Sequence, residues 1–375
     1  MRVLIVIVSL VVVLPLASLA WLSSQVTAQS ILDGISEAMK EEGLQMSHDN
    51  QSSLGIFPNA FLEVSQISVI IPASDQAPEV SIDLSGLRFD ASLFSLLSSP
   101  RGNLSVRGLK VDSIDLSNLT SAVVIEDTVT LPNLSAELWK GALNGKVVID
   151  SGSDNVVIRT EGILENADAS DVFMSLADMD LLTGTLSLNW NLEIIPPESD
   201  NGIAELTGKL NVSSETMTLE SIDLEGSICS TVALAEGRRP SSPLSGNTIF
   251  TRFDASQTLA GTEITIDELT LVTSAMTLNG KGVLDRASTA FTAEAVASLD
   301  AKSMNQRSDC RISSSIANIQ WPVRCKGRTD AGNARSWCQV DVSSIVEQTL
   351  KGRIKDKLKL DDDSNLIQSL LKRIR

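Results

Sequence analysis

The chain has 375 residues, which is enough for two or three domains or for one long β structure. Its formal net charge of -17 argues against binding to the phosphates of nucleic acids. Aromatic residues make up only 3% of the chain, tyrosine is absent and histidine occurs once, so few rings are available to stack on bases or sugars.

The N-terminal segment predicts a membrane anchor at residues 1–28. The 20 residues from 3 to 22 carry no charge, which is close to the number that a helix needs to cross a bilayer. Arg2 favours a cytoplasmic N-terminus, and Trp21 stands where interfacial aromatic residues are common. A cleaved signal peptide is the alternative, because residues 26–28 form an acceptable small-residue cleavage site, although the apolar run exceeds the usual about 7–15 residues. Under either reading the rest of the chain is exported.

Residues 29–130 form the first predicted β region. A short helix is expected at residues 30–44, where apolar side chains recur at helical spacing and Gly43 ends the pattern. Strands are expected at residues 55–71, 81–89 and 104–116, with one or two helical turns at residues 91–98 before Pro100. The only histidine, His48, lies in a polar segment without a nearby cysteine and is interpreted as a bystander.

Residues 131–341 form a second predicted β region, whose clearest strand is at residues 183–194. Apolar side chains occupy every second position there, which is the period of a strand with one apolar and one polar face. The alternation returns in later pairs, including Ile222 with Leu224, and turn residues between the runs predict antiparallel hairpins. One internal helix is expected at residues 170–182. The positions predicted to line a common apolar face are Leu186, Leu188, Trp190, Leu192, Ile194, Ile264, Ile266, Leu269, Leu271, Met276 and Leu278.

The C-terminal residues 342–375 predict a basic amphipathic helical tail. Residues 351–375 hold eight Lys and Arg side chains against four Asp, in a chain that is acidic as a whole. Such a segment suits a lipid headgroup surface or an acidic partner. An ordinary solvated helix packed on the end of the sheet is the alternative.

Four cysteines predict disulfides in the exported part of the chain. Cys325 and Cys338 flank a short polar loop and form the favoured pair, which leaves Cys229 with Cys310. The sequence alone does not choose among the three possible connectivities. Zinc binding is the rival interpretation, but the spacing typical of zinc ligands is missing.

The Ser, His, Asp and Glu residues of the sequence do not occur in a recognisable catalytic motif. No serine stands in a Gly-x-Ser-x-Gly sequence, and the aspartates at 361–363 are better interpreted as a solvated turn than as a calcium site. We therefore predict a protein that is not an enzyme and that has no metal and no cofactor. An exported hydrolase is the competing class, and it would require Ser, His and Asp, or metal ligands, to cluster in the fold.

The apolar side of the predicted sheet decides the function. An apolar sheet face must be buried against another sheet, against helices or against a ligand, and the predicted helices are too few and too short to cover it. A closed sandwich or barrel is one solution. The other is an open trough that carries lipid acyl chains, since each buried CH₂ contributes about 0.8 kcal/mol. The interior, rich in Leu, Val, Ile, Ala and Met, favours the trough.

The order of these segments resembles the AsmA family of bacterial envelope proteins, which are relatives of the bridge-like lipid-transfer proteins. The resemblance covers nearly the whole chain through short sequences. They are the opening order of span, helix and residues 55–58, then residues 87–97, 139–145, 176–188, 259–271, 276–285, 321–327 and 337–341. Two features depart from the family: the chain is shorter than many members, and Gly261-Thr262 replaces a common Asp-Gly turn.

This resemblance implies a bacterial inner-membrane protein with one N-terminal span, a cytoplasmic N-terminus and the bulk of the chain in the periplasm. It also implies a curved β-groove that handles phospholipid, supports outer-membrane biogenesis with an outer-membrane or envelope partner, and contains no catalytic residues. The expected fold is thus mainly β, an elongated antiparallel sheet curved into an open apolar groove. The alternative function is a closed β scaffold or assembly factor for outer-membrane proteins without lipid cargo.

Overall fold

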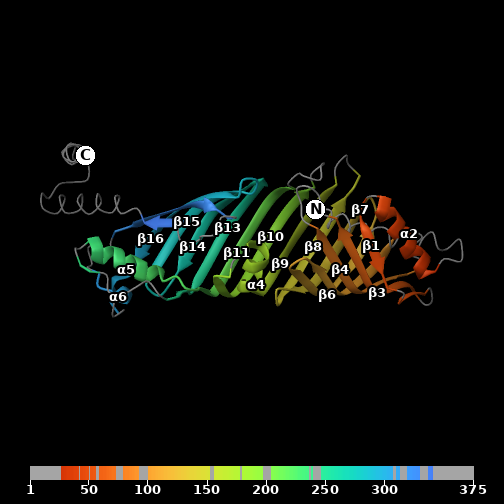
Figure 1. The fold of residues 1–375 in the computed structure, drawn as a ribbon, viewed down its shortest axis with the longest axis horizontal. Helices are drawn as coiled ribbons and strands as arrows, with labels where there is room; N and C mark the ends of the chain where they lie inside the picture. Colours follow the sequence, from red (N-terminus) through yellow and green to blue (C-terminus); the bar gives the residue numbers. More distant parts are fainter. Residues whose placement is uncertain are drawn as a thin grey trace. The chain divides into compact units, whose positions relative to one another are not determined.

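The computed structural model shows a mainly β protein with short helices (Figure 1). It describes residues 27–41, 43–49, 51–55, 59–72, 79–92, 100–152, 156–177, 180–196, 204–235, 238–239, 246–306, 310–312, 319–329 and 337–340. These residues fall into two compact units. The first contains residues up to 180 with 184–213 and 257–263, and the second contains 181–183, 214–256 and the residues from 264 onwards.

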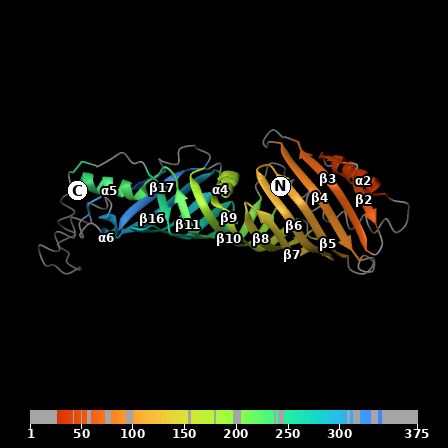
Figure 2. The same cartoon turned by 90° about the horizontal axis from the view of Figure 1, so that it is seen from below.

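The first unit is an antiparallel ladder in which each strand pairs with the next one along the chain from β3 to β10 (Figure 2). On the other edge of β3, β1 pairs with its second half and β2 with its first half. The strands are β1 (Gln45–His48), β2 (Ser52–Gly55), β3 (Ala60–Ile71), β4 (Val80–Ala91), β5 (Arg101–Val111), β6 (Ile114–Ile125), β7 (Thr128–Leu138), β8 (Gly141–Asp150), β9 (Val157–Asp168) and β10 (Leu182–Ile195).

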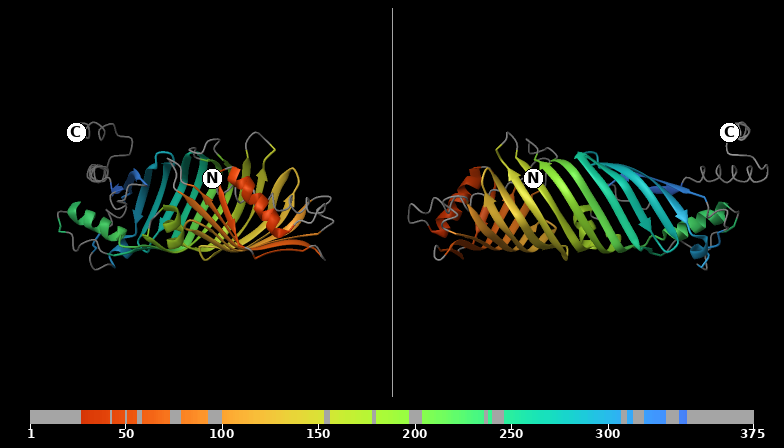
Figure 3. Two further views of the ribbon diagram at one scale, coloured as in Figure 1. Left: turned by 45° about the vertical axis from the view of Figure 1, so that its right-hand side comes forward. Right: turned by 180° about the vertical axis from the view of Figure 1, so that it is seen from behind.

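Alternation, with a shift by one position at Ser65 and Gln66 on β3, places the apolar residues of this ladder in one core. On β3, for example, Val64, Ile67 and Val69 are fully buried, while the residues between them face the other side. Helix α2 (Ala28–Glu41) lies across the N-terminal strands and adds Leu32, Ile35 and other apolar side chains to the same core (Figure 3). A shorter helix, α4 (Ala169–Ala177), follows β9. The apolar side of the first unit is therefore covered by protein.

The second unit contains a further antiparallel ladder from β15 to β18. A tight turn joins β14 to β15, in which the Thr273 N–H donates to the carbonyl of Met276 at 2.8 Å. The elements are β12 (Thr248–Phe250), β14 (Glu263–Val272), β15 (Met276–Asp285), β16 (Ala290–Leu299), β17 (Trp321–Arg328), β18 (Cys338–Val340), α5 (Leu224–Ala235) and α6 (Ala301–Met304). The residues of β11 (Glu205–Leu219) and β13 (Arg252–Gly261) are divided between the two units.

Helix α5 corrects one prediction, because the alternation of Ile222 and Leu224 was expected to continue a strand. The helix begins instead at Leu224, because the Asp223 side chain accepts a hydrogen bond from the Gly226 N–H at 2.7 Å and caps its first turn. The Thr248 hydroxyl oxygen also accepts from the Leu224 N–H at 2.9 Å. Ile228 and Val232, four residues apart, then face one core.

That core, which we call core 2, closes one end of the β15–β17 ladder. It consists of Ile228, Cys229, Val232, Ala275, Met276, Ala297, Leu299, Met304, Cys310, Ile312 and Trp321. A disulfide between Cys229 and Cys310 fastens α5 to residues 310–312 across 81 positions of sequence, and a second disulfide joins Cys325 to Cys338. Both predicted pairings are thus confirmed.

The other expected elements compare as follows. The helix expected at 30–44 is present as α2, and the helix expected at 170–182 is present as the shorter α4, because Leu182 already begins β10. The predicted boundary at residue 130 is not where the two units divide, because β7, β8 and β9 continue the first ladder. The anchor at 1–28 apart from residues 27 and 28, most of the turn at 91–98 and the tail at 342–375 lie outside the described residues. Within the described part of the chain, no helix has the length and apolarity needed to span a membrane.

Candidate functional site: the half-buried sheet face of the second unit

The predicted face residues on β10 belong to the wall of the first core. Leu186 is 2% exposed, and Leu188, Trp190 and Ile194 are partly buried against that core. Trp190 lies over Gly162 of β9, and its Nε1 donates to the Thr160 hydroxyl at 3.0 Å. Leu192, also half-buried, is outside the residues that pack there. These side chains are held by protein contacts.

The predicted residues of the second unit are more exposed. Met276 is buried in core 2 and Leu278 packs against its edge. Ile264, Ile266, Leu269 and Leu271 of β14 are half-buried and belong to neither core. Between the two apolar pairs of β14, Asp267 and Glu268 are both exposed.

The register of β15, β16 and β17 defines a continuous apolar surface. Gly280, Ala295 and Val323 lie opposite one another, and the rows before and after them carry equally apolar or small residues. We call this surface the second-unit face. Its residues are Leu278, Gly280, Gly282, Leu284, Phe291, Ala293, Ala295, Val323, Cys325 and Gly327, all of them half-buried except Gly282, which is buried.

Two leucines of β14 extend this face. The Thr270 hydroxyl donates to Asn279 Oδ1 at 3.0 Å, so Thr270 and Asn279 share the opposite, polar side of the hairpin. Leu269 and Leu271 therefore lie on the same side as Leu278. The polar side carries exposed charged residues on the neighbouring strands, including Lys281, Glu294, Arg324, Lys326 and Arg328.

The two ends of the second-unit face differ. At one end, Met276, Ala297, Leu299 and Trp321 are buried in core 2, beside α5 and α6. The Trp321 Nε1 has no hydrogen-bond partner among the described residues. At the other end, the rings of Phe291 and Trp337 meet edge to face, with their centroids 5.0 Å apart. The middle of the face is lined by glycine and alanine.

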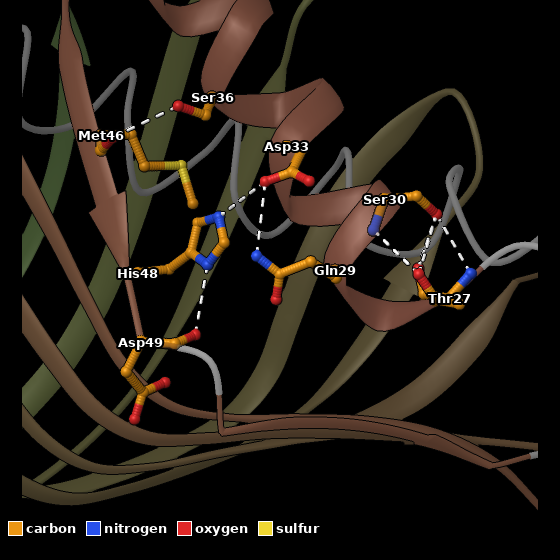
Figure 4. Close-up of polar contacts among 8 residues, drawn as sticks. All are labelled: Thr27, Gln29, Ser30, Asp33, Ser36, Met46, His48 and Asp49. Atoms are coloured by element: carbon orange, nitrogen blue, oxygen red, sulfur yellow. Dashed lines mark hydrogen bonds and ion pairs between the residues drawn. The ribbon is translucent and has the colours of Figure 1, made fainter.

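A separate polar contact joins α2 to β1 in the first unit (Figure 4). His48, the only histidine, is 9% exposed in its side chain, and its Nε2 lies 3.3 Å from Asp33 Oδ1. The Ser36 hydroxyl on the same helix donates to the Met46 carbonyl at 3.3 Å. The arrangement fastens a helix to a strand, and the surrounding polar side chains form no nucleophile–base pair.

A second polar cluster lies at the start of α4. Lys140 Nζ is 2.9 Å from Asp168 Oδ2 and 2.8 Å from Asp171 Oδ2, beside a cavity of about 670 Å³. Trp139 and Lys140 form the β7–β8 turn with φ values of 49° and 64°, which non-glycine residues rarely adopt. The Trp139 Nε1 donates to the Ser175 hydroxyl at 3.1 Å, so the turn is fastened to α4 by both residues.

The described residues also limit the possible chemistry. All four cysteines are in disulfides, and no group of three His, Cys, Asp or Glu side chains within the described ranges is placed to hold a metal ion. Comparisons with protein-family models, with curated proteins and with solved structures found no match to this chain. The second-unit face is therefore assessed on its own geometry.

Proposed function

We propose that the protein binds phospholipid by receiving an acyl chain on the second-unit face. In this proposal it is an AsmA-like envelope protein, held at the bacterial inner membrane by residues 1–28, that supports outer-membrane biogenesis. The observation that carries the proposal is a sheet side that is apolar, only half-buried and bounded by core 2 at one end. A sheet side of this kind lowers its free energy by covering its apolar area.

The dimensions of the face suit one acyl chain. Ala297 in core 2 and Phe291 at the ring pair are six residues apart on β16, which corresponds to about 20 Å of strand. Half of a bilayer's hydrocarbon core, the space of one acyl chain, is about 15 Å thick. The small side chains of Gly280, Ala293 and Ala295 leave room for a hydrocarbon above the sheet. Each CH₂ removed from water there contributes about 0.8 kcal/mol.

A closed envelope scaffold without lipid is the second candidate. It is favoured by the first unit, whose apolar side is buried in its own core. The two candidates differ in what they predict for the second unit, because a scaffold needs no ligand on a half-buried face.

Native mass spectrometry of the full chain, purified in mild detergent, tests the proposal. The expected result is co-purified phospholipid in the wild-type protein and its loss in Ala295→Asp, which places a charge among the apolar residues of the face. The matched control is Val296→Asp, because Val296 is the next residue on β16, faces the polar side and is 36% exposed. A wild-type protein without bound lipid, or equal lipid in the two variants, would overturn the proposal. Circular dichroism verifies that both variants fold.

A further inference from the structure

Among the described residues, Trp337 stands at the end of the second-unit face that lies away from core 2, beside Phe291. Its ring stands edge-on to Phe291 at 5.0 Å between centroids and an interplanar angle of 73°. Both rings lie directly over Gly327, where an added Cβ would come within 2.7 Å of Trp337 Cδ1 and 2.9 Å of Phe291 Cε1. Gly327 is thus the position at which β17 leaves space for the two rings.

The backbone brings Trp337 to the apolar side against the register of the strands. Cys338 pairs with Cys325, so a regular strand would place Trp337 opposite Lys326, on the polar side. The chain instead bends at residue 337, and the Trp337 carbonyl accepts a hydrogen bond from the Lys326 N–H at 3.0 Å. The indole consequently turns toward Phe291 and Gly327.

The disulfide between Cys325 and Cys338 holds this arrangement in place. Cys325 is itself a residue of the second-unit face, and Cys338 directly follows Trp337 in the chain. The disulfide to Cys325 therefore fixes Cys338, and with it the position of the neighbouring Trp337 at the end of the second-unit face. The described part of β18 is only three residues long, so the covalent bond supplements a short ladder.

We infer that Trp337 sets the length of the acyl chain that the second-unit face accepts. This inference rests on the proposed function. The ligand class is a single saturated acyl chain that lies along the glycine and alanine positions, with one end against core 2 and the other at the Phe291–Trp337 pair. Trp337 limits the bound chain by occupying the space over Gly327 into which additional methylenes would extend.

Competition between lipids tests the inference directly. The full chain in mild detergent is equilibrated with a mixture of phosphatidylcholines that differ only in acyl-chain length, and the bound species are counted by native mass spectrometry. In the wild-type protein the bound fraction should rise with length and then stop rising. In Trp337→Ala the rise should continue to longer chains, by about fourfold for each methylene newly covered.

Two further variants separate this role from a loss of folding. Trp337→Phe keeps an aromatic ring and should retain a wild-type cut-off or shift it only slightly. The double variant Cys325→Ala/Cys338→Ala leaves the ring intact but releases its backbone, and it should shift the cut-off in the same direction as Trp337→Ala. Circular dichroism identifies any variant that does not fold. If one of Trp337→Ala and the double cysteine variant fails to fold, the length cut-off of the other one tests the role of Trp337.

The outcomes distinguish this inference from the proposed function. Lipid binding with the same length cut-off in all variants would overturn the role of Trp337 and leave the proposed function standing. If neither the wild-type protein nor any variant retains lipid, both fail. A shift to longer chains in both Trp337→Ala and the double cysteine variant supports the inference.

Discussion

His48 on β1 and Asp33 on α2 form a side-chain polar contact between two elements that also share an apolar core, with 3.3 Å between His48 Nε2 and Asp33 Oδ1. The other ring nitrogen, Nδ1, lies 3.2 Å from the carbonyl oxygen of Asp49 (Figure 4). The residue that looks like a bystander in the sequence therefore fastens α2 to the sheet.

Replacement of His48 by alanine should loosen α2. We expect the free energy of unfolding to fall by about 1–3 kcal/mol, because the change leaves a buried gap and removes the polar contacts of the ring with Asp33 and Asp49. Hydrogen exchange should quicken in residues 28–41 and stay unchanged in β5 to β8. Glu37→Gln is the matched control, since Glu37 is exposed on the same helix. Equal exchange in the two variants would show that the contact does not hold the helix.

The pairing of Lys140 with Asp168 predicts a pH-dependent contribution to stability. The hydrogen bond from Lys140, and to a lesser degree the N–H groups of Asp171 and Ser170, hold the pKa of Asp168 below its usual range, although partial burial opposes them. The folded protein therefore binds fewer protons than the unfolded chain as Asp168 titrates. The resulting stabilisation is present above the ordinary pKa of about 3.9 and is lost as the pH falls through the lower folded value.

Lys140→Met should reveal this contribution in urea unfolding measured from neutral to acidic pH. The variant should be less stable than the wild-type protein at neutral pH, and the difference should shrink below about pH 4. Lys146→Met is the control, because Lys146 is a half-buried lysine on β8 whose Nζ is 3.8 Å from Glu161 Oε1, a longer contact than those of Lys140. A stability difference for Lys140→Met that is constant with pH would contradict the assignment.

The two disulfides should contribute unequally to the stability of the second unit. Cys229 and Cys310 are 6% and 2% exposed and close a loop with a sequence separation of 81, against 13 for Cys325 and Cys338. A longer closed loop removes more conformational entropy from the unfolded chain, so Cys229→Ala/Cys310→Ala should cost about 2–5 kcal/mol. Cys325→Ala/Cys338→Ala should cost less. Hydrogen exchange in β15 to β17 measures the stability loss in each double variant. A larger loss for Cys325→Ala/Cys338→Ala than for Cys229→Ala/Cys310→Ala would refute the explanation from loop length.

Much of the fold follows from local pattern. The period-two alternation predicts several of the strands, including β3, β4 and β10, because each of them has an apolar and a polar side. The residues expected as one strand at 104–116 are instead divided between β5 and β6. Cysteine spacing favours the observed disulfide pairs but does not by itself choose the connectivity. Helix α5 does not follow from local pattern, because Ile222 and Leu224 continue the alternation of a strand. The helix depends instead on the Asp223 cap and on Thr248, which is distant in the sequence. Local sequence also does not reveal that β7 to β9 belong to the first unit.

The candidate site is less predictable for a physical reason. A buried sheet side and a half-buried one have the same alternation, so the sequence does not distinguish the covered residues of β3 from the half-buried ones of β16. Leu186 and Trp190 were expected on an open face, yet they are the wall of a core. The contact of Trp337 with Phe291 and Gly327 depends on the pairing of β16 with β17 and on the bend at residue 337, and local sequence reveals neither of them.

The contact between Trp190 and Gly162 gives the sharpest stability prediction. An added Cβ at Gly162 would lie 2.6 Å from Trp190 Cζ2 and 2.6 Å from the carbonyl oxygen of Asn144, so Gly162→Ala requires the strand or the ring to move. We expect a loss of about 1–3 kcal/mol of stability, the usual cost of overpacking, and a shifted indole N–H resonance as the hydrogen bond to Thr160 lengthens.

Gly34→Ala is a control of opposite sign, because nothing lies within 4 Å of a Cβ added there and alanine favours the helix by up to about 1 kcal/mol. Urea unfolding should therefore move to lower concentration for Gly162→Ala and to higher concentration for Gly34→Ala. A neutral Gly162→Ala would mean that Trp190 is free to move and that β10 is more open than the structure shows.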